Sequence, residues 1–183
     1  MPLSLLTPPS AEPVTLAEMK TYLRVEHDDE DELIGRLIAA ARQACESATR
    51  RAFLTQSWRL TRARWPHSGQ IDVPLAPLAA VTAARIRNAD GAETEVDPAR
   101  FKVVAGAAPG LILARRPLPA PAGGTVELDL VAGYGDSAAS VPADLVEAVR
   151  RLAARLYDSR GLDAAAMPAD VAALLQPHRV VAL

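Results

Sequence analysis

The sequence is poor in cysteine, aromatic residues and lysine. Its single cysteine, Cys45, excludes a disulfide framework and any zinc site built from several cysteines. Aromatic residues make up only 4% of the chain, too few for the stacking platform of a single-strand binder. Lys20 and Lys102 are the only lysines among 20 basic residues, which 22 acidic residues outweigh. The resulting net charge of -2 argues against a protein that coats DNA.

The sequence also lacks the apolar segments that target or anchor a chain. No apolar run approaches the roughly 18 residues of a membrane-spanning helix. The opening residues Met1–Leu6 have no basic region and no apolar stretch long enough for a signal peptide. We therefore expect synthesis in the cytoplasm and no membrane partner. Because half of the 183 residues are hydrophobic, the chain can bury a core, and its length suits one domain or one domain with an appendage.

Helical patterns occupy the two ends of the chain. Thr15 followed by Glu18 is a capping-box pattern and predicts a short helix over 16–24. A second, long helix is predicted over 29–52 from apolar residues at helical spacing. These are Leu33, Leu37, Ala41, Ala44, Ala48 and Ala52, flanked by Ile34, Ile38 and Cys45. The stripe is rich in small residues, so another helix can approach it closely.

The middle of the chain changes to short, partly alternating segments separated by turn residues, which predict a mostly antiparallel β unit. The expected strands are 58–64, 70–73, 80–87, 101–104, 111–113 and 125–131. In the last of these, Val126, Leu128 and Leu130 should face one way and Glu127 and Asp129 the other.

Helical pattern returns after Pro142, with Leu145, Val149, Leu152 and Leu156 as the apolar face. Gly161 should end this helix, and a last short helix is expected over 168–175. The predicted fold class is α+β, with a helical core and a β-rich insertion. The expected parts are an extended N-terminal arm (1–14), a helical core (15–57 and 141–176), the insertion (58–140) and a C-terminal tail (177–183).

Two motifs could carry chemistry, and each has a plainer explanation. The acidic run Glu26–Glu32 could ligate a metal through oxygen, but it lacks the glycine of a calcium loop. Acidic residues also favour the first turn of a helix, which explains the run without a metal. Gly133-Tyr134-Gly135-Asp136 lies between a strand and a helix but completes neither phosphate-binding fingerprint, so a turn is expected.

No catalytic, metal-binding or cofactor-binding residues are predicted. The histidines His27, His67 and His178 do not form a zinc-hydrolase motif, and no nucleophile elbow is present. Arginines recur in pairs, at Arg50–Arg51, Arg85 and Arg87, Arg115–Arg116, and Arg150–Arg151 with Arg155. They could form a basic face for nucleic acid or acidic partners, or they could be ordinary solvated residues with acidic neighbours.

The C-terminal tail is apolar at its end, where no following chain can cover it. Val180, Val181 and Leu183 could fold back on their own domain or insert into a partner, for example by adding a strand to its sheet. Both possibilities stay open from composition, as they do for the proline-rich N-terminal arm, which is either a loose end or a clasp on a neighbour.

The order of several segments resembles a known family. Pro13–Lys20 leads through Leu23–Val25 and Asp28–Ile34 to Leu54–Trp58, and much later come Val131–Asp136 and Val141–Leu145. Together these resemble the head–tail connector (adaptor) proteins of long-tailed bacteriophages, which are also found in prophages and gene transfer agents. Leu174–Arg179 resembles the ending of some members.

The resemblance implies a structural ring subunit, commonly in twelve copies, that docks on the portal at the capsid vertex. Its other partner would be a stopper or tail-completion protein, and DNA would pass through the channel without sequence-specific binding. It implies portal docking by the tail residues Pro177, His178, Arg179, Val180, Val181 and Leu183. It also implies close helix packing, within or between subunits, at Ala41, Ala44 and Ala48.

Two other functions remain open at this stage. A helical DNA-binding regulator would place the 150–160 helix in a groove, and its affinity would depend steeply on salt. A small enzyme would need a pocket in the β unit lined by several polar groups of shifted pKa, for which the sequence offers no cluster.

Overall fold

The structure, a computed structural model, describes residues 3–159 and 167–180 and divides them into two units. The β unit contains Thr55–Gly133, the N-terminal residues up to Pro9, and Val180. The helical unit contains Ser10–Leu54 and Tyr134–Arg179 and is therefore interrupted in sequence by the β unit. None of the described helices has the length and hydropathy needed to span a bilayer.

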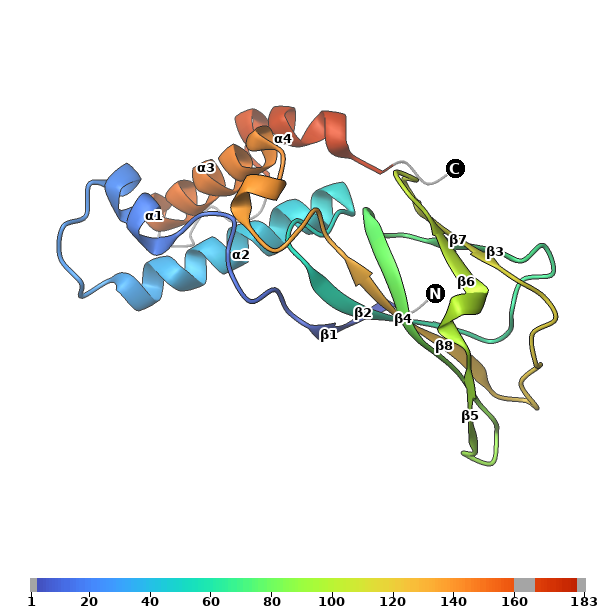
Figure 1. Cartoon of the computed structure of the whole chain (residues 1–183). Coiled ribbons are helices and arrows are strands. Elements are labelled where there is room, and N and C mark those ends of the chain that lie inside the picture. The colour runs from blue at the N-terminus through green and yellow to red at the C-terminus, as the bar shows by residue number, and fades with distance from the viewer. Residues whose placement is uncertain (1–2, 160–166, 181–183) are drawn as a thin grey trace. The chain divides into compact units, whose positions relative to one another are not determined.

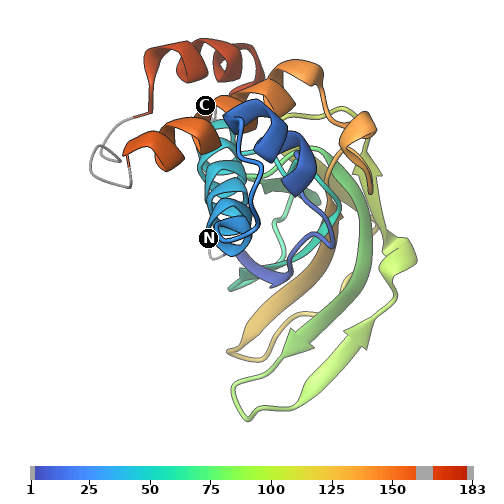
Figure 2. The same ribbon diagram turned by 90° about the vertical axis from the view of Figure 1, so that its left-hand side faces the viewer.

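The helical unit contains α1 (Leu16–Leu23), α2 (Asp31–Thr49), α3 (Ala143–Ser159) and α4 (Ala169–Leu175). α3 lies alongside α2 and packs against α4, as Figures 1 and 2 show. α1 begins at the predicted capping box, with Glu18 N donating to Thr15 Oγ1 and Thr15 N donating to Glu18 Oε2. α2 ends three residues before the predicted position, where Arg50 adopts a left-handed conformation with φ of 56°.

The core of the helical unit joins one face of each long helix. α2 contributes Ile34, Ile38, Ala41 and Cys45, each at most 2% exposed. α3 contributes the predicted residues Leu145, Val149 and Leu152, whereas Leu156 is only partly buried. The predicted small-residue stripe on α2 is only partly buried in the subunit: Ala41 is fully buried, Ala44 and Ala48 are partly buried, and Leu33 is 42% exposed. The flanking pair Ile34 and Ile38, four residues apart, faces the core more fully than the stripe itself.

The β unit is built from two antiparallel sheets (Figure 1). The larger sheet has the order β1-β2-β8-β4-β5, from Leu3–Thr7, Gln56–Arg62, Thr125–Ala132, Leu78–Arg87 and Glu93–Val96. The smaller sheet has the order β3-β7-β6, from Gln70–Val73, Gly110–Ala114 and Phe101–Val104. β1 and β5, which form the two edges of the larger sheet, were not predicted from the sequence.

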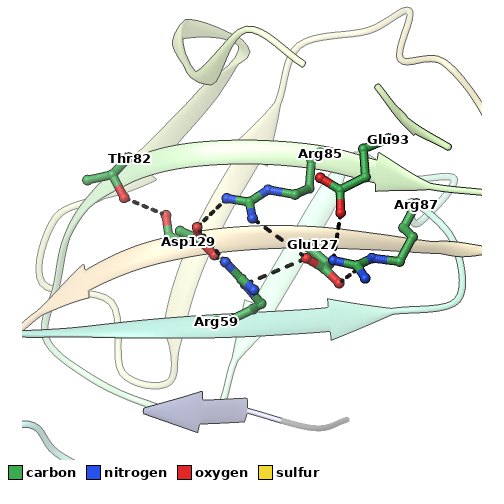
Figure 3. Close-up of polar contacts among 7 residues, drawn as sticks. All are labelled: Arg59, Thr82, Arg85, Arg87, Glu93, Glu127 and Asp129. Carbon is green, nitrogen blue, oxygen red and sulfur yellow. Dashed lines mark hydrogen bonds and ion pairs between the residues drawn. The ribbon is translucent and has the colours of Figure 1, made fainter. Parts of the chain in front are cut away.

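Alternation in β8 separates a buried face from a charged face, as predicted. Val126, Leu128 and Leu130 are at most 2% exposed. They lie opposite Ile86, Ala84 and Val81 of β4 and next to β2 on the other side. Glu127 and Asp129 point to the other face of the sheet, where they meet arginines of the neighbouring strands (Figure 3).

Candidate functional site

The acidic run belongs to a helix start and an ion-pair cluster. Asp31 and Glu32 occupy the first turn of α2, where the helix dipole favours negative charge. Lys20 Nζ lies 2.6 Å from Oδ1 of both Asp28 and Asp31. The hydrogen bond that Lys20 donates to Asp28 lowers the pKa of the Asp28 carboxyl group. Within residues 3–159 and 167–180, no group of three or more histidine, cysteine or acidic residues is placed to hold a metal ion.

The glycine-rich segment after β8 is a turn, as predicted. Gly133 and Gly135 have φ values of 135° and 156°, which other residues rarely adopt. A Cβ on Gly135 would lie 2.5 Å from Ser140 Oγ, so a side chain has no room there. The main-chain N–H of Tyr134 donates to the carbonyl oxygen of Phe53. The two glycines therefore serve the path of the chain between strand and helix.

Three arginines and three acidic residues form a charge network across β2, β8, β4 and β5 (Figure 3). Asp129 is its centre. Arg59 binds it through both carboxylate oxygens, with Nε–Oδ1 of 2.7 Å and Nη2–Oδ2 of 3.0 Å, and Arg85 donates to Oδ2. The hydrogen bond from Arg59 lowers the pKa of Asp129, against an opposing effect of burial.

The rest of the network extends toward the end of β4. Arg87 Nη2 lies 2.7 Å from Glu93 Oε1, and Arg87 Nε lies 3.5 Å from Glu127 Oε1. Glu127 is 8% exposed and carries a buried Oε2 that accepts no hydrogen bond among the described residues. That oxygen lies 3.6 Å from Arg59 Nε. Three positive and three negative groups are thus balanced on this face, which leaves no net positive charge there for phosphate.

The arginines of α3 are occupied in the same way. Glu147 accepts from Arg150 and Arg151 at 2.7 and 2.8 Å, and Arg155 donates to Asp170 of α4. The hydrogen bond from Arg151 lowers the pKa of Glu147. Sequence reasoning listed these arginines as a possible basic face. The structure supports the alternative, solvated residues with acidic neighbours; Arg160 lies outside the described residues.

The C-terminal tail begins on the helical unit. Gln176–His178 form a 3-10 turn directly after α4, and His178 Nε2 lies 2.6 Å from Asp144 Oδ2. Arg51 Nε donates to the carbonyl oxygen of His178, also at 2.6 Å. Val180 is 7% exposed, so this residue is covered by its own chain. Val181 and Leu183, the other expected apolar docking residues, lie outside the described residues, whereas Pro177 and Arg179 are included in them.

Comparison with known proteins identifies the family. The phage gp6-like head-tail connector protein family matches residues 13–98. A chain from the neck of an empty GTA particle, computed with C6 symmetry, is 34% identical with a TM-score of 0.86. The alignment covers 100% of this chain and 97% of that one. The chain belongs to the head–tail connector family.

Two further structures agree with this assignment. A chain in the virion of a native gene transfer agent (GTA) particle is 35% identical with a TM-score of 0.86. A chain from the neck of a native GTA particle, computed with C12 symmetry, is 35% identical with a TM-score of 0.83. Both alignments cover 100% of this chain and 97% of the other. No curated protein sequence matches the chain. The α+β connector fold and the family predicted from segment order are confirmed.

Proposed function

We propose that this connector is a structural, non-enzymatic subunit of a ring that joins the head of a phage or gene transfer agent particle to its tail. The observation that carries the proposal is the similarity to the GTA neck chain over the whole length of both proteins, at 34% identity. The family match over residues 13–98 supports the same function independently.

The proposed partners are the portal on one side, a stopper or tail-completion protein on the other, and further copies of this chain. The C6 and C12 symmetry of the similar necks supports a closed ring, with twelve copies as our expectation. The proposed role toward DNA is to line a channel without gripping it. The paired arginines of β4 and α3 support this role, since ion pairs within the subunit compete with phosphate contacts.

A partly exposed stripe on α2 is our candidate for the contact between subunits. It consists of Leu33, Leu37, Ala44 and Ala48, which follow one another at helical spacing. Ala41, which the sequence grouped with them, is fully buried in its own helical unit. Leu33 keeps 42% of its surface exposed, so a neighbouring subunit could still bury apolar area there.

The proposed portal contact is the C-terminal tail, especially its apolar end after Val180, which is itself buried in the subunit. The test is to mix the full chain with the purified portal ring of the same particle and to image the product by electron microscopy. We expect a second ring stacked on the portal. Deletion of residues 181–183, which keeps both the 3-10 turn and the buried Val180, should abolish stacking without lowering the melting temperature. Equal docking by the shortened chain would overturn the role of the tail.

The comparisons support neither a DNA-binding regulator nor an enzyme. If the protein were a DNA-binding regulator, its affinity for duplex DNA should decrease steeply with salt, which is easily measured. We expect no such dependence for this connector between 50 and 200 mM salt, a range over which phosphate-binding proteins lose roughly 10³-fold or more in affinity. A steep slope would favour the regulator instead.

A further inference from the structure

Two contacts hold the start of the C-terminal tail on the helical unit. The imidazole of His178 meets Asp144, at the start of α3, and the His178 carbonyl oxygen accepts from Arg51, just after α2. These partners lie 34 and 127 residues away in the sequence. Three helix ends therefore converge on one residue.

The contacts are partly shielded from solvent, which strengthens them. The His178 side chain is 20% exposed and that of Asp144 is 40% exposed, so only the histidine side of this contact is well shielded. Burial raises the pKa of Asp144, but the hydrogen bond and charge of His178, with main-chain N–H groups at the helix start, outweigh it and lower the pKa overall. The side chain and the main chain of His178 are held by different partners, which fixes both its position and its orientation.

The conformation of the chain changes directly after this residue. Gln176–His178 continue α4 as a 3-10 turn, whereas Arg179 is extended, with φ of -63° and ψ of 126°. Since His178 is held through both its imidazole and its carbonyl oxygen, a change in the path of the tail can begin at Arg179 without disturbing α4.

We propose that Arg51, Asp144 and His178 form a clamp that positions the tail for docking, and that His178 is not itself a portal contact. The proposal rests on the proposed docking of the tail. A tail that is already held at His178 loses less conformational entropy when it binds, so the clamp raises affinity without touching the portal. Docking then rearranges only the residues from Arg179 onward.

The experiment compares Arg51→Ala, Asp144→Asn and the double variant with the wild-type full chain. Two quantities are measured: amide hydrogen exchange of residues 176–180, and affinity for the purified portal ring. We expect faster exchange confined to these residues and roughly tenfold weaker portal binding in the double variant, the loss of one or two ordinary hydrogen bonds. Arg51→Lys, which keeps a donor for the carbonyl oxygen, should recover part of the affinity.

Arg155→Ala is the matched control, because it removes an exposed ion pair of the same unit. It should change neither quantity. Unchanged exchange in the double variant would show that no clamp exists, and faster exchange with undiminished binding would show that the clamp does not position the tail. If the wild-type chain fails to bind the portal, docking itself is refuted and the positioning role falls with it. The hydrogen-exchange data would still show whether the contacts of His178 with Arg51 and Asp144 hold the turn in place.

Discussion

At the scale of single residues, Asp129 is the centre of the β unit's charge network. Its side chain is 13% exposed, and it accepts from Arg59 and Arg85. Asp129→Ala leaves two arginines facing Glu127 alone. We expect the free energy of unfolding to decrease by about 2–4 kcal/mol, near the lower end of the range for breaking a buried ion pair.

Urea denaturation provides the measurement, with Glu93→Gln as the control. The Arg87–Glu93 pair belongs to the same network, but both side chains are 48% exposed. Exposed pairs contribute about 1 kcal/mol or less, so this variant should remain close to the wild type. Equal losses in the two variants would contradict the central position of Asp129.

Cys45 provides a second prediction at this scale. This α2 residue is fully buried in the core of the helical unit, and burial raises the pKa of its thiol to about 12. Because the thiolate is the reactive form, a disulfide reagent at pH 8 should not modify the native protein. Reaction should follow unfolding when denaturant is added. Rapid modification of the folded chain would mean that this part of α2 opens locally.

At the scale of elements, the exposed stripe of α2 has a direct test. Leu33→Glu places a charge where the proposed neighbour packs, so ring formation on the portal should be lost. The melting temperature of the single subunit should stay close to that of the wild type, since Leu33 is 42% exposed there. Arg155→Gln on α3 is the control and should assemble normally. Normal assembly of Leu33→Glu would place the subunit contact elsewhere.

Local signals predicted many elements correctly. The capping box at Thr15 and the alternation in β8 each depend on residues within a few positions, and both are present in the structure. β1 was missed because it becomes a strand only by pairing with β2, which is distant in the sequence. Leu3, for example, lies opposite Leu60. The sequence pattern could not tell which side of the α2 stripe faces the core, because Leu33 and Ile34 are similarly apolar. Only the partner helix determines which of them is covered.

The candidate site was harder to predict than the fold. The sequence indicated a docking tail in two ways: Pro177–Arg179 resembles the ending of some connectors, and the residues after it are apolar. Neither signal could reveal that Arg51 and Asp144 meet His178, because such contacts are absent from any local pattern. Portal contact and subunit packing remain predictions, since they concern neighbouring molecules.

At the scale of the whole molecule, the carboxyl groups determine the response to acid. Hydrogen bonds from Arg59 and Arg151 lower the pKa values of Asp129 and Glu147, and the pKa of Asp144 is also lowered. A folded-state pKa below the unfolded one stabilises the protein above the unfolded value, and this stabilisation disappears as the pH falls through the folded value.

We therefore expect the melting temperature to be steady from about pH 7 to pH 5 and to decrease below about pH 4, the usual range of carboxyl groups. Circular dichroism at a series of pH values measures this. Asp129→Asn should show a shallower decrease, because one of the contributing groups no longer titrates. A melting temperature that stays constant down to pH 3 would contradict the assigned ion pairs.

The interruption of the helical unit by the β unit has a consequence for synthesis on the ribosome. α2 ends at Thr49, and its partner α3 begins at Ala143. At translation rates of roughly 5–20 residues per second, α2 waits on the order of 5–20 s before α3 is made. During that time only the short helix α1 can pack against α2, so much of the apolar face formed by Ile34, Ile38 and Cys45 lacks its native cover. The β unit can fold first, and α3 and α4 then complete the helical unit.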